Sequence, residues 1–166
     1  KKAQKKRPRV SREEQIRQQA NPSTRLSGQQ KTISLPFAYS SDIMHEYIQL
    51  NQSKMLDAYE RLAGLLRMLS SNPNLYQEVK DWITKNTKIA DAQLSELTTQ
   101  RLNILDMAGD FMPPTINVPD NYKTNFEASH PIANLMISTL HRVDIELAEC
   151  EKLYLSLLID DLQYRQ

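Results

Sequence analysis

The chain has one cysteine, three glycines and three histidines among its 166 residues. The single thiol of Cys150 excludes a disulfide within the chain and favours a reducing compartment. The three glycines are far apart in the sequence, so no glycine-rich loop is available to cradle a phosphate group. His45 begins like the helix motif of zinc proteases, but Gln49 occupies the place of the second histidine ligand. We therefore expect no enzymatic activity, no cofactor and no metal site.

The other titratable side chains offer no catalytic pair either. His141 and Cys150 are nine residues apart, a spacing that puts two side chains on opposite faces of a helix. A nucleophile and its base must lie within hydrogen-bonding distance, so this pair is excluded. His141 lies one helical turn from Asp144, and we expect these two to form an ion pair on the helix surface. Cys150 is predicted to be a buried structural thiol.

The sequence also lacks long apolar stretches. No run approaches the length that a membrane-spanning helix needs, and no signal-peptide core is present. The hydrophobic content of 40% supports a core but leaves part of the chain as a polar tail. Few glycines, together with many leucine, glutamine, glutamate and lysine residues, favour a mainly α protein. These features predict a cytoplasmic protein with no membrane partner and no small-molecule substrate.

The positive charge is concentrated at the N-terminus. Residues 1–31 hold ten of the 21 basic residues and two of the 20 acidic ones, a net charge of +8. The other 135 residues hold eleven basic and eighteen acidic side chains, a net charge of −7. A basic arm on an acidic body favours nucleic acid or an anionic membrane surface as the partner. If the partner is DNA, the arm, residues 1–30, is expected to contact phosphates through Lys1, Lys2, Lys5, Lys6, Arg7, Arg9, Arg12 and Arg17.

Hydrophobic periodicity predicts one strand followed by helices. Residues 31–38 alternate apolar and polar side chains, as a strand with one buried face does. Helical patterns then run from residue 41 to 69, where Asn51 can end one helix and Ser53 can cap the next. Further helices are predicted at 75–108 and 132–162. Between these, residues 115–126 are predicted to form two short strands around a Pro-Asp-Asn turn.

The order strand, helix, turn, helix in residues 31–69 resembles the ribbon–helix–helix DNA-binding fold. In that fold the strand pairs with the same strand of a second subunit, and the two-stranded ribbon enters the major groove. We expect an obligate homodimer, because an unpaired strand would leave a row of backbone donors and acceptors open. One face of the strand would form the core of the dimer ribbon through Ile33, Leu35 and Phe37. The other face would read DNA bases through Gln30, Thr32 and Ser34.

A phosphate-binding site is predicted at the start of the second helix of this unit. Free backbone N–H groups and the helix dipole favour an anion at such a terminus. Ser53 would cap the helix there, and Lys54 would add a positive charge. Lys31, at the start of the strand, is expected to contact the backbone of the same DNA.

The chain also resembles the AcaB-like transcriptional regulators of conjugative plasmids and integrative elements, over residues 31–160. The stretch 116–161 is similar to the family's strand, X-Pro step and C-terminal helix, although Ile132 and Ala133 stand where the family often has a glycine. The segment that opens the family's long helix is matched by Asn72, Pro73, Tyr76 and Trp82.

This resemblance implies a bacterial, homodimeric transcription regulator that binds promoter or operator DNA and is associated with the nucleoid or a plasmid. It further implies an activator of conjugative-transfer genes, with RNA polymerase as an additional partner. The expected fold is mainly α, with a ribbon–helix–helix core at residues 31–70. The basic arm, residues 1–30, precedes this core, and a helical extension with a short β segment follows at residues 71–166.

A helical scaffold or assembly protein of a mobile element is the alternative. Residues 75–108 and 132–162 each carry a long apolar stripe that suits a helix bundle. The basic tail of such a scaffold would bind nucleic acid or a membrane. The two hypotheses differ in the partner of the strand at 31–38. The regulator pairs this strand with a second copy, whereas the scaffold pairs it within the chain, for example with residues 115–118, or leaves it unpaired.

Overall fold

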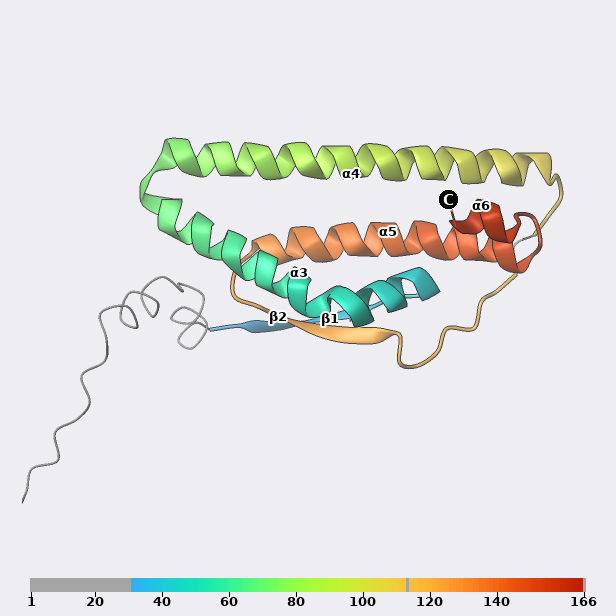
Figure 1. The fold of residues 1–166 in the computed structure, drawn as a ribbon, viewed down its shortest axis with the longest axis horizontal. Coiled ribbons are helices and arrows are strands. Elements are labelled where there is room, and N and C mark those ends of the chain that lie inside the picture. Colours follow the sequence, from blue (N-terminus) through green and yellow to red (C-terminus); the bar gives the residue numbers. More distant parts are fainter. Residues whose placement is uncertain (1–30, 113, 166) are drawn as a thin grey trace, which may run out of the picture. The chain divides into compact units, whose positions relative to one another are not determined.

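Helices dominate the part of the chain that the structure describes. The computed structural model describes residues 31–112 and 114–165, and Figure 1 shows how the elements follow one another. The predicted mainly α class with a short β segment is confirmed. The predicted basic arm lies outside the described residues. In chain order the elements are β1 (Ile33–Ala38), α3 (Asp42–Met68), the 3-10 helix η1 (Leu69–Ser71), α4 (Pro73–Met107), β2 (Lys123–Ala128), α5 (Ile132–Leu155) and α6 (Asp161–Arg165).

The two strands form an antiparallel sheet within the chain. Its register places Ile33 opposite Ala128 and Ala38 opposite Lys123. This intrachain pair corrects the predicted pairing of residues 31–38 with a second copy. Of the two strands predicted in 115–126, only one forms, and it lies at 123–128.

Pro36 explains why β1 is an edge strand. The Tyr39 N–H donates to the Tyr122 carbonyl at 3.1 Å. Because such bonds recur at every second residue of an antiparallel pair, the backbone polar groups of Phe37 and Leu35 face β2 and those of Pro36 face the outer edge. Proline has no N–H to donate to a third strand there. A second copy of β1 that paired at this outer edge would therefore lack a ladder hydrogen bond at Pro36.

α3 is one continuous helix of 27 residues, where the sequence pattern predicts two helices separated at Asn51. The Asn51 side chain donates to the Tyr47 carbonyl, one turn earlier, at 3.2 Å, so it binds the helix instead of ending it. No glycine or proline occurs between residues 50 and 54 to stop the helix. The two helices of a ribbon–helix–helix core are therefore merged into one, and Ser53 lies in its interior.

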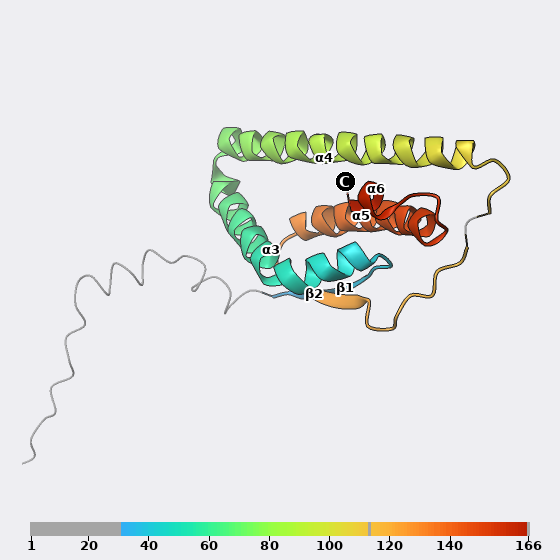
Figure 2. The same cartoon turned by 45° about the vertical axis from the view of Figure 1, so that its right-hand side comes forward.

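The core lies between the inner face of the sheet, α3 and α5. The Phe37 and Phe126 rings are both buried, with centroids 5.8 Å apart. Of the residues predicted to form a dimer core, Phe37 is thus buried in the chain's own core, Leu35 packs against that core, and Ile33 is 59% exposed. Figures 1 and 2 show the sheet on one side of α3 and α5, and α4 on the other. The remaining buried members of this core are Tyr39, Met44, Ile48 and Met136.

Two carboxylates of α5 hold the start of α3. Asp144 is buried and accepts three hydrogen bonds, from the Ser40 N–H at 2.8 Å and from the N–H and the hydroxyl of Ser41 at 2.9 Å each. Glu151, two turns further along α5, accepts the Asp42 N–H at 2.6 Å. Negative charge at a helix N-terminus is favoured by the helix dipole. These bonds fix the point at which β1 turns into α3.

The same bonds correct the predicted surface ion pair between His141 and Asp144. Asp144 lies on the buried face of α5, where three donors already occupy its carboxylate. The spacing of one turn is present, but the side chain of Asp144 faces the start of α3.

Charged pairs attach α4 to α5. No side chain of α4 is fully buried. Arg101 donates two hydrogen bonds to the Glu146 carboxylate, and both of these side chains are largely shielded from solvent. A more exposed pair joins Arg142 and Asp91 at 2.6 Å. The apolar side chains on the face of α4 that is turned toward α3 and α5, among them Ile83 and Leu97, are only partly buried.

α5 ends at Leu155, earlier than the predicted end at residue 162. The Leu157 N–H donates to the Tyr154 carbonyl at 2.9 Å, and the Leu158 N–H donates to the Leu153 carbonyl at 3.0 Å. This is a Schellman motif, in which the position of Leu157 is usually glycine because its φ is positive. Here φ is 59°. None of the helices in the described ranges is long and apolar enough to cross a membrane.

Candidate nucleic-acid interface

The face of the sheet that points away from the helices is polar and exposed. Side chains alternate along a strand, so burial of Phe37 and Phe126 on the inner face turns their sequence neighbours outward. The register places Ser34 opposite Glu127 and Pro36 opposite Asn125. We call this surface the outer ribbon face; all its members are exposed, and they are Thr32, Ser34, Pro36, Ala38, Lys123, Asn125 and Glu127.

This face offers both hydrogen-bond donors and acceptors. The Thr32 hydroxyl donates to the Glu127 carboxylate at 3.1 Å, which orients both side chains. Asn125 carries an amide that donates and accepts, and it stands opposite Pro36, whose side chain is short and cannot hydrogen-bond. A two-stranded ribbon fits the major groove of DNA, where asparagine pairs with the adenine edge through two hydrogen bonds. The outer ribbon face therefore offers the kinds of hydrogen-bond donor and acceptor that base edges can pair with.

Both ends of the sheet are anchored to helices. At one end, Asp144 and Glu151 hold the turn from β1 into α3, as described above. At the other end, Ser129 follows β2 and donates to the Glu60 carboxylate at 2.9 Å. Arg67 donates to the Ser129 carbonyl at 3.2 Å. The strand backbone that carries the exposed side chains is consequently held at both of its ends before any ligand binds.

Apart from Arg67, the residues at the two ends of the sheet contribute little positive charge to this face. Burial lowers the pKa of His130, and the nearby Arg67 lowers it further, so the neutral imidazole is favoured. At the opposite end, the hydrogen bond to Asp42 raises the pKa of Tyr122 to about 12, so its hydroxyl stays protonated at neutral pH. On the face itself, Lys123 and Glu127 carry one charge of each sign. The outer ribbon face alone thus lacks the charge that strong binding to phosphates requires.

The structure describes only some of the residues predicted to contact DNA. Thr32 and Ser34 are exposed on the outer ribbon face, on the side predicted to contact bases. Lys31 is exposed directly before them in the chain. Gln30 and the basic residues of the arm lie outside the described residues. The roles of all these side chains in DNA binding stay predictions.

Ser53 and Lys54 do not form the predicted phosphate site at a helix terminus. Both are exposed in the middle of α3, where the backbone N–H groups are used within the helix. The true N-terminus of α3 is no substitute. The carboxylates of Asp144 and Glu151 already occupy its donors and would repel a phosphate.

Sequence reasoning did not single out Asn125 or Lys123. The signal was present in residues 123–128, where lysine, asparagine and glutamate alternate with threonine, phenylalanine and alanine. The register that places Phe126 opposite Leu35 decides which of these alternating side chains face outward from the sheet. That position depends on pairing with β1, which the sequence pattern does not give.

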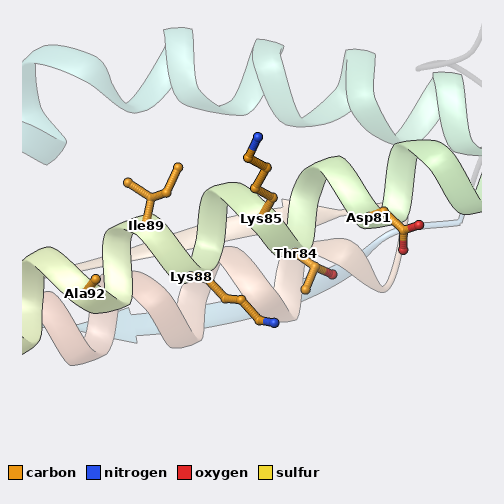
Figure 3. A pocket seen from close by; sticks show the side chains of 6 residues that line it. All are labelled: Asp81, Thr84, Lys85, Lys88, Ile89 and Ala92. Atoms are coloured by element: carbon orange, nitrogen blue, oxygen red, sulfur yellow. The ribbon is translucent and has the colours of Figure 1, made fainter.

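Other candidate sites in the described residues are less developed. No group of three or more histidine, cysteine, aspartate or glutamate side chains there could hold a metal ion. Burial raises the pKa of Cys150, which favours an unreactive thiol. A shallow hollow on α4 carries two lysines, but Figure 3 shows Lys85 and Lys88 pointing to opposite sides of the helix. Such an arrangement cannot converge on one anion.

Comparison with known proteins shows a shared fold. No protein-family model and no curated protein matches the sequence. A solved structure, described as the crystal structure of selenomethionine-containing AcaB from uropathogenic E. coli, is similar with a TM-score of 0.63. The similarity covers 82% of this chain and 69% of the AcaB chain at 12% sequence identity. The chain therefore has an AcaB-like fold, as the resemblance of its sequence motifs implies.

Proposed function

We propose that the protein is a sequence-specific DNA-binding regulator of a mobile genetic element. The observation that carries the proposal is the outer ribbon face, an exposed and pre-positioned polar surface that follows the basic N-terminal segment in the chain. The AcaB-like fold supports it, because the family that the sequence resembles consists of transcription regulators. The target is promoter or operator DNA, and the finer form of the proposal is an activator of conjugative-transfer genes that acts with RNA polymerase.

The charge distribution assigns the affinity for DNA and the discrimination between bases to two different parts of the chain. The segment 1–31 carries a net charge of +8, which suits non-specific contacts with phosphates. On the outer ribbon face the positive charge of Lys123 is offset by the negative charge of Glu127. This face therefore contributes more to discrimination between bases than to the affinity for DNA. Glu127 accepts a hydrogen bond from Thr32 in the free protein. In a complex, the same carboxylate suits the exocyclic amine of cytosine.

The proposed reading surface spans both strands instead of two copies of one strand. Ser34 on β1 and Asn125 on β2 are close in register, since Ser34 lies opposite Glu127 and Asn125 lies opposite Pro36. A strand of six residues is about 20 Å long, which matches several base pairs along the groove. Each subunit then carries a complete ribbon. A homodimer would present two ribbons to the two halves of a symmetric site.

Competition binding tests this proposal. The probe for the full chain is DNA from the upstream regions of genes adjacent to the gene for this protein. Duplexes of random sequence serve as competitor, and binding is measured at two salt concentrations. The double variant Thr32→Ala with Ser34→Ala is expected to lose about 5- to 150-fold in affinity per base contact at the specific site, and little on random DNA. The matched control is Ser53→Ala with Thr84→Ala, which removes the same two exposed residue types from α3 and α4.

Equal losses on both kinds of DNA would mean that these side chains do not read bases. Unchanged affinity in the double variant would remove the ribbon from the interface altogether.

A helical scaffold or assembly protein with a basic tail is the second candidate. The observation that favours it is the pairing of β1 with β2 inside the chain, which the scaffold hypothesis expects. The same competition assay separates the two functions. A scaffold would bind specific and random duplexes equally and through residues 1–31 alone.

A further inference from the structure

An apolar groove lies between the C-terminal half of α3 and the first turns of α4. Its volume is about 620 Å³. Tyr59, Leu62 and Leu65 line it from α3, and Val79 and Trp82 line it from α4. The apolar stripes continue along both helices, to Met68 on α3 and to Ile89 on α4, at helical spacing. Exposed apolar side chains thus lie beyond the groove on both helices, with Lys85 between Trp82 and Ile89 on α4.

Trp82 stands at this groove with 60% of its surface exposed. It is the chain's single tryptophan. Large exposed aromatic side chains are typical of interfaces, where they insert into pockets of a partner. The same patch therefore holds a projecting ring and a groove that can receive one. Such self-complementarity is the property that a two-fold symmetric contact requires.

The charges beside the groove are also self-complementary. Arg61 lines it from α3 and Glu78 lines it from α4. Neither is in an ion pair with another described residue. A two-fold axis parallel to the groove places α3 of each copy over α4 of the other. Arg61 of each copy then lies near Glu78 of its partner, twice by symmetry.

We propose that the α3–α4 groove is the contact through which two copies of this chain dimerise, with Trp82 of each copy seated in the groove of the other. The occupant is a second copy because the projecting ring, the groove and both charges lie on one patch. The inference gives the homodimer of the proposed function its interface, in place of the β1 ribbon. Its test needs no DNA, so its failure and the failure of the DNA-binding proposal are distinguishable.

The exposed area is sufficient for such a dimer. Trp82, Met68, Ile89, Leu75 and Leu65 expose 60%, 64%, 51%, 43% and 36% of their surfaces. Large side chains present roughly 150–250 Å² each, so these five expose about 500 Å² of apolar surface per copy. A standard interface buries about 800 Å² per partner, a little more than half of it apolar. The patch supplies that apolar share.

Trp82 reports directly on its own burial. Sedimentation velocity and tryptophan emission of the full chain are measured from nanomolar to high micromolar concentration. We expect the mass to rise to that of a dimer and the emission to shift to shorter wavelength over the same range. A monomer at all concentrations, or a dimer whose emission does not shift, would overturn the proposal.

Variants locate the contact. Trp82→Ala and Leu65→Ala are expected to weaken the dimer, Trp82→Ala by at least about 30-fold, as for a buried hot-spot side chain. The matched control is Leu102→Ala on the opposite side of α4, where the leucine is 51% exposed and expected to contribute nothing. Circular dichroism verifies that each variant is folded. A dimer that depends on Leu102 as much as on Leu65 would contradict the assignment.

A charge exchange provides a second test that leaves the apolar groove intact. Arg61→Glu alone or Glu78→Arg alone places like charges across the two-fold axis, and each is expected to weaken the dimer about fivefold or more. The double variant restores opposite charges and should recover the affinity. Failure of the double variant to improve on either single one would show that these residues do not meet across an interface.

Discussion

Replacement of Asp144 by alanine should strongly destabilise the protein, because this side chain joins α5 to the start of α3. Its carboxylate accepts three hydrogen bonds, two of which come from the buried Ser41. Hydrogen bonds to a charged group contribute about 1.5–3 kcal/mol each. The Ser40 N–H is only partly buried and can turn to water, and loss of the carboxylate also removes the cost of burying it. We therefore expect Asp144→Ala to lower the free energy of unfolding by about 3–4 kcal/mol.

Urea unfolding followed by circular dichroism measures this loss. Asp144→Asn retains one acceptor oxygen for the Ser41 donors and should lose about half as much. The control is Asp91→Ala, which breaks a pair with Arg142 that is about 40% exposed on both sides. An exposed pair of this kind contributes at most about 1 kcal/mol. If Asp144→Ala costs no more than Asp91→Ala, the proposed role of the α5 carboxylates in holding α3 is refuted.

Three further predictions concern the arm, a titrating carboxylate and a strained turn. Deletion of residues 1–12 should weaken binding to all DNA sequences and flatten its salt dependence without changing the circular dichroism; equal affinity of the truncated chain would remove the arm from the interface. Burial raises the pKa of Glu151 above its ordinary value of 4.5, so the folded state keeps this proton at a higher pH than the unfolded state does. The contribution of the protonated Glu151 to stability is therefore complete below pH 4.5 and declines as the pH rises from 4.5 through the raised pKa. Glu151→Gln should therefore gain stability relative to the parent chain as the pH rises above 4.5, and a difference that is independent of pH would contradict the cause assigned to the shift. Leu157→Gly should raise the free energy of unfolding by about 1 kcal/mol, because φ is 59° at this exposed residue; a destabilised variant would show that the leucine is not strained.

The long helices and the chemistry of the first strand were accessible from sequence. The apolar stripe that begins after Asn72 predicts α4 well, since Asn72 caps this helix and Pro73 is favoured in its first turn. The alternation around Phe37 likewise predicts which side chains of β1 face inward. Local spacing decides both features, so no knowledge of the rest of the chain was required.

Pairing and capping partners were not accessible, because they connect residues that are far apart in the chain. Asp144 is 103 residues from Ser41, and no spacing rule relates the two. The strand partner of β1 lies about 90 residues later. The unbroken course of α3 is a different, local case, because Asn51 donates to the Tyr47 carbonyl one turn earlier instead of ending the helix. The pairing of β1 with β2 replaces the expected two-copy ribbon with a ribbon within one chain, and Asn125 joins the candidate interface only as a result.

The central claim is that the outer ribbon face selects DNA sequence. Selection of binding sites from a pool of randomised duplexes tests it most directly, with the full chain compared with Asn125→Ala and with the control Asn86→Ala on α4. Asparagine reads adenine through two hydrogen bonds. We predict that the intact chain and the control enrich the same motif, and that Asn125→Ala loses the preference for one base pair within it while the flanking positions persist. A pool without an enriched motif would contradict the claim. So would a motif that is the same for the intact chain, for Asn125→Ala and for the double variant of Thr32 and Ser34.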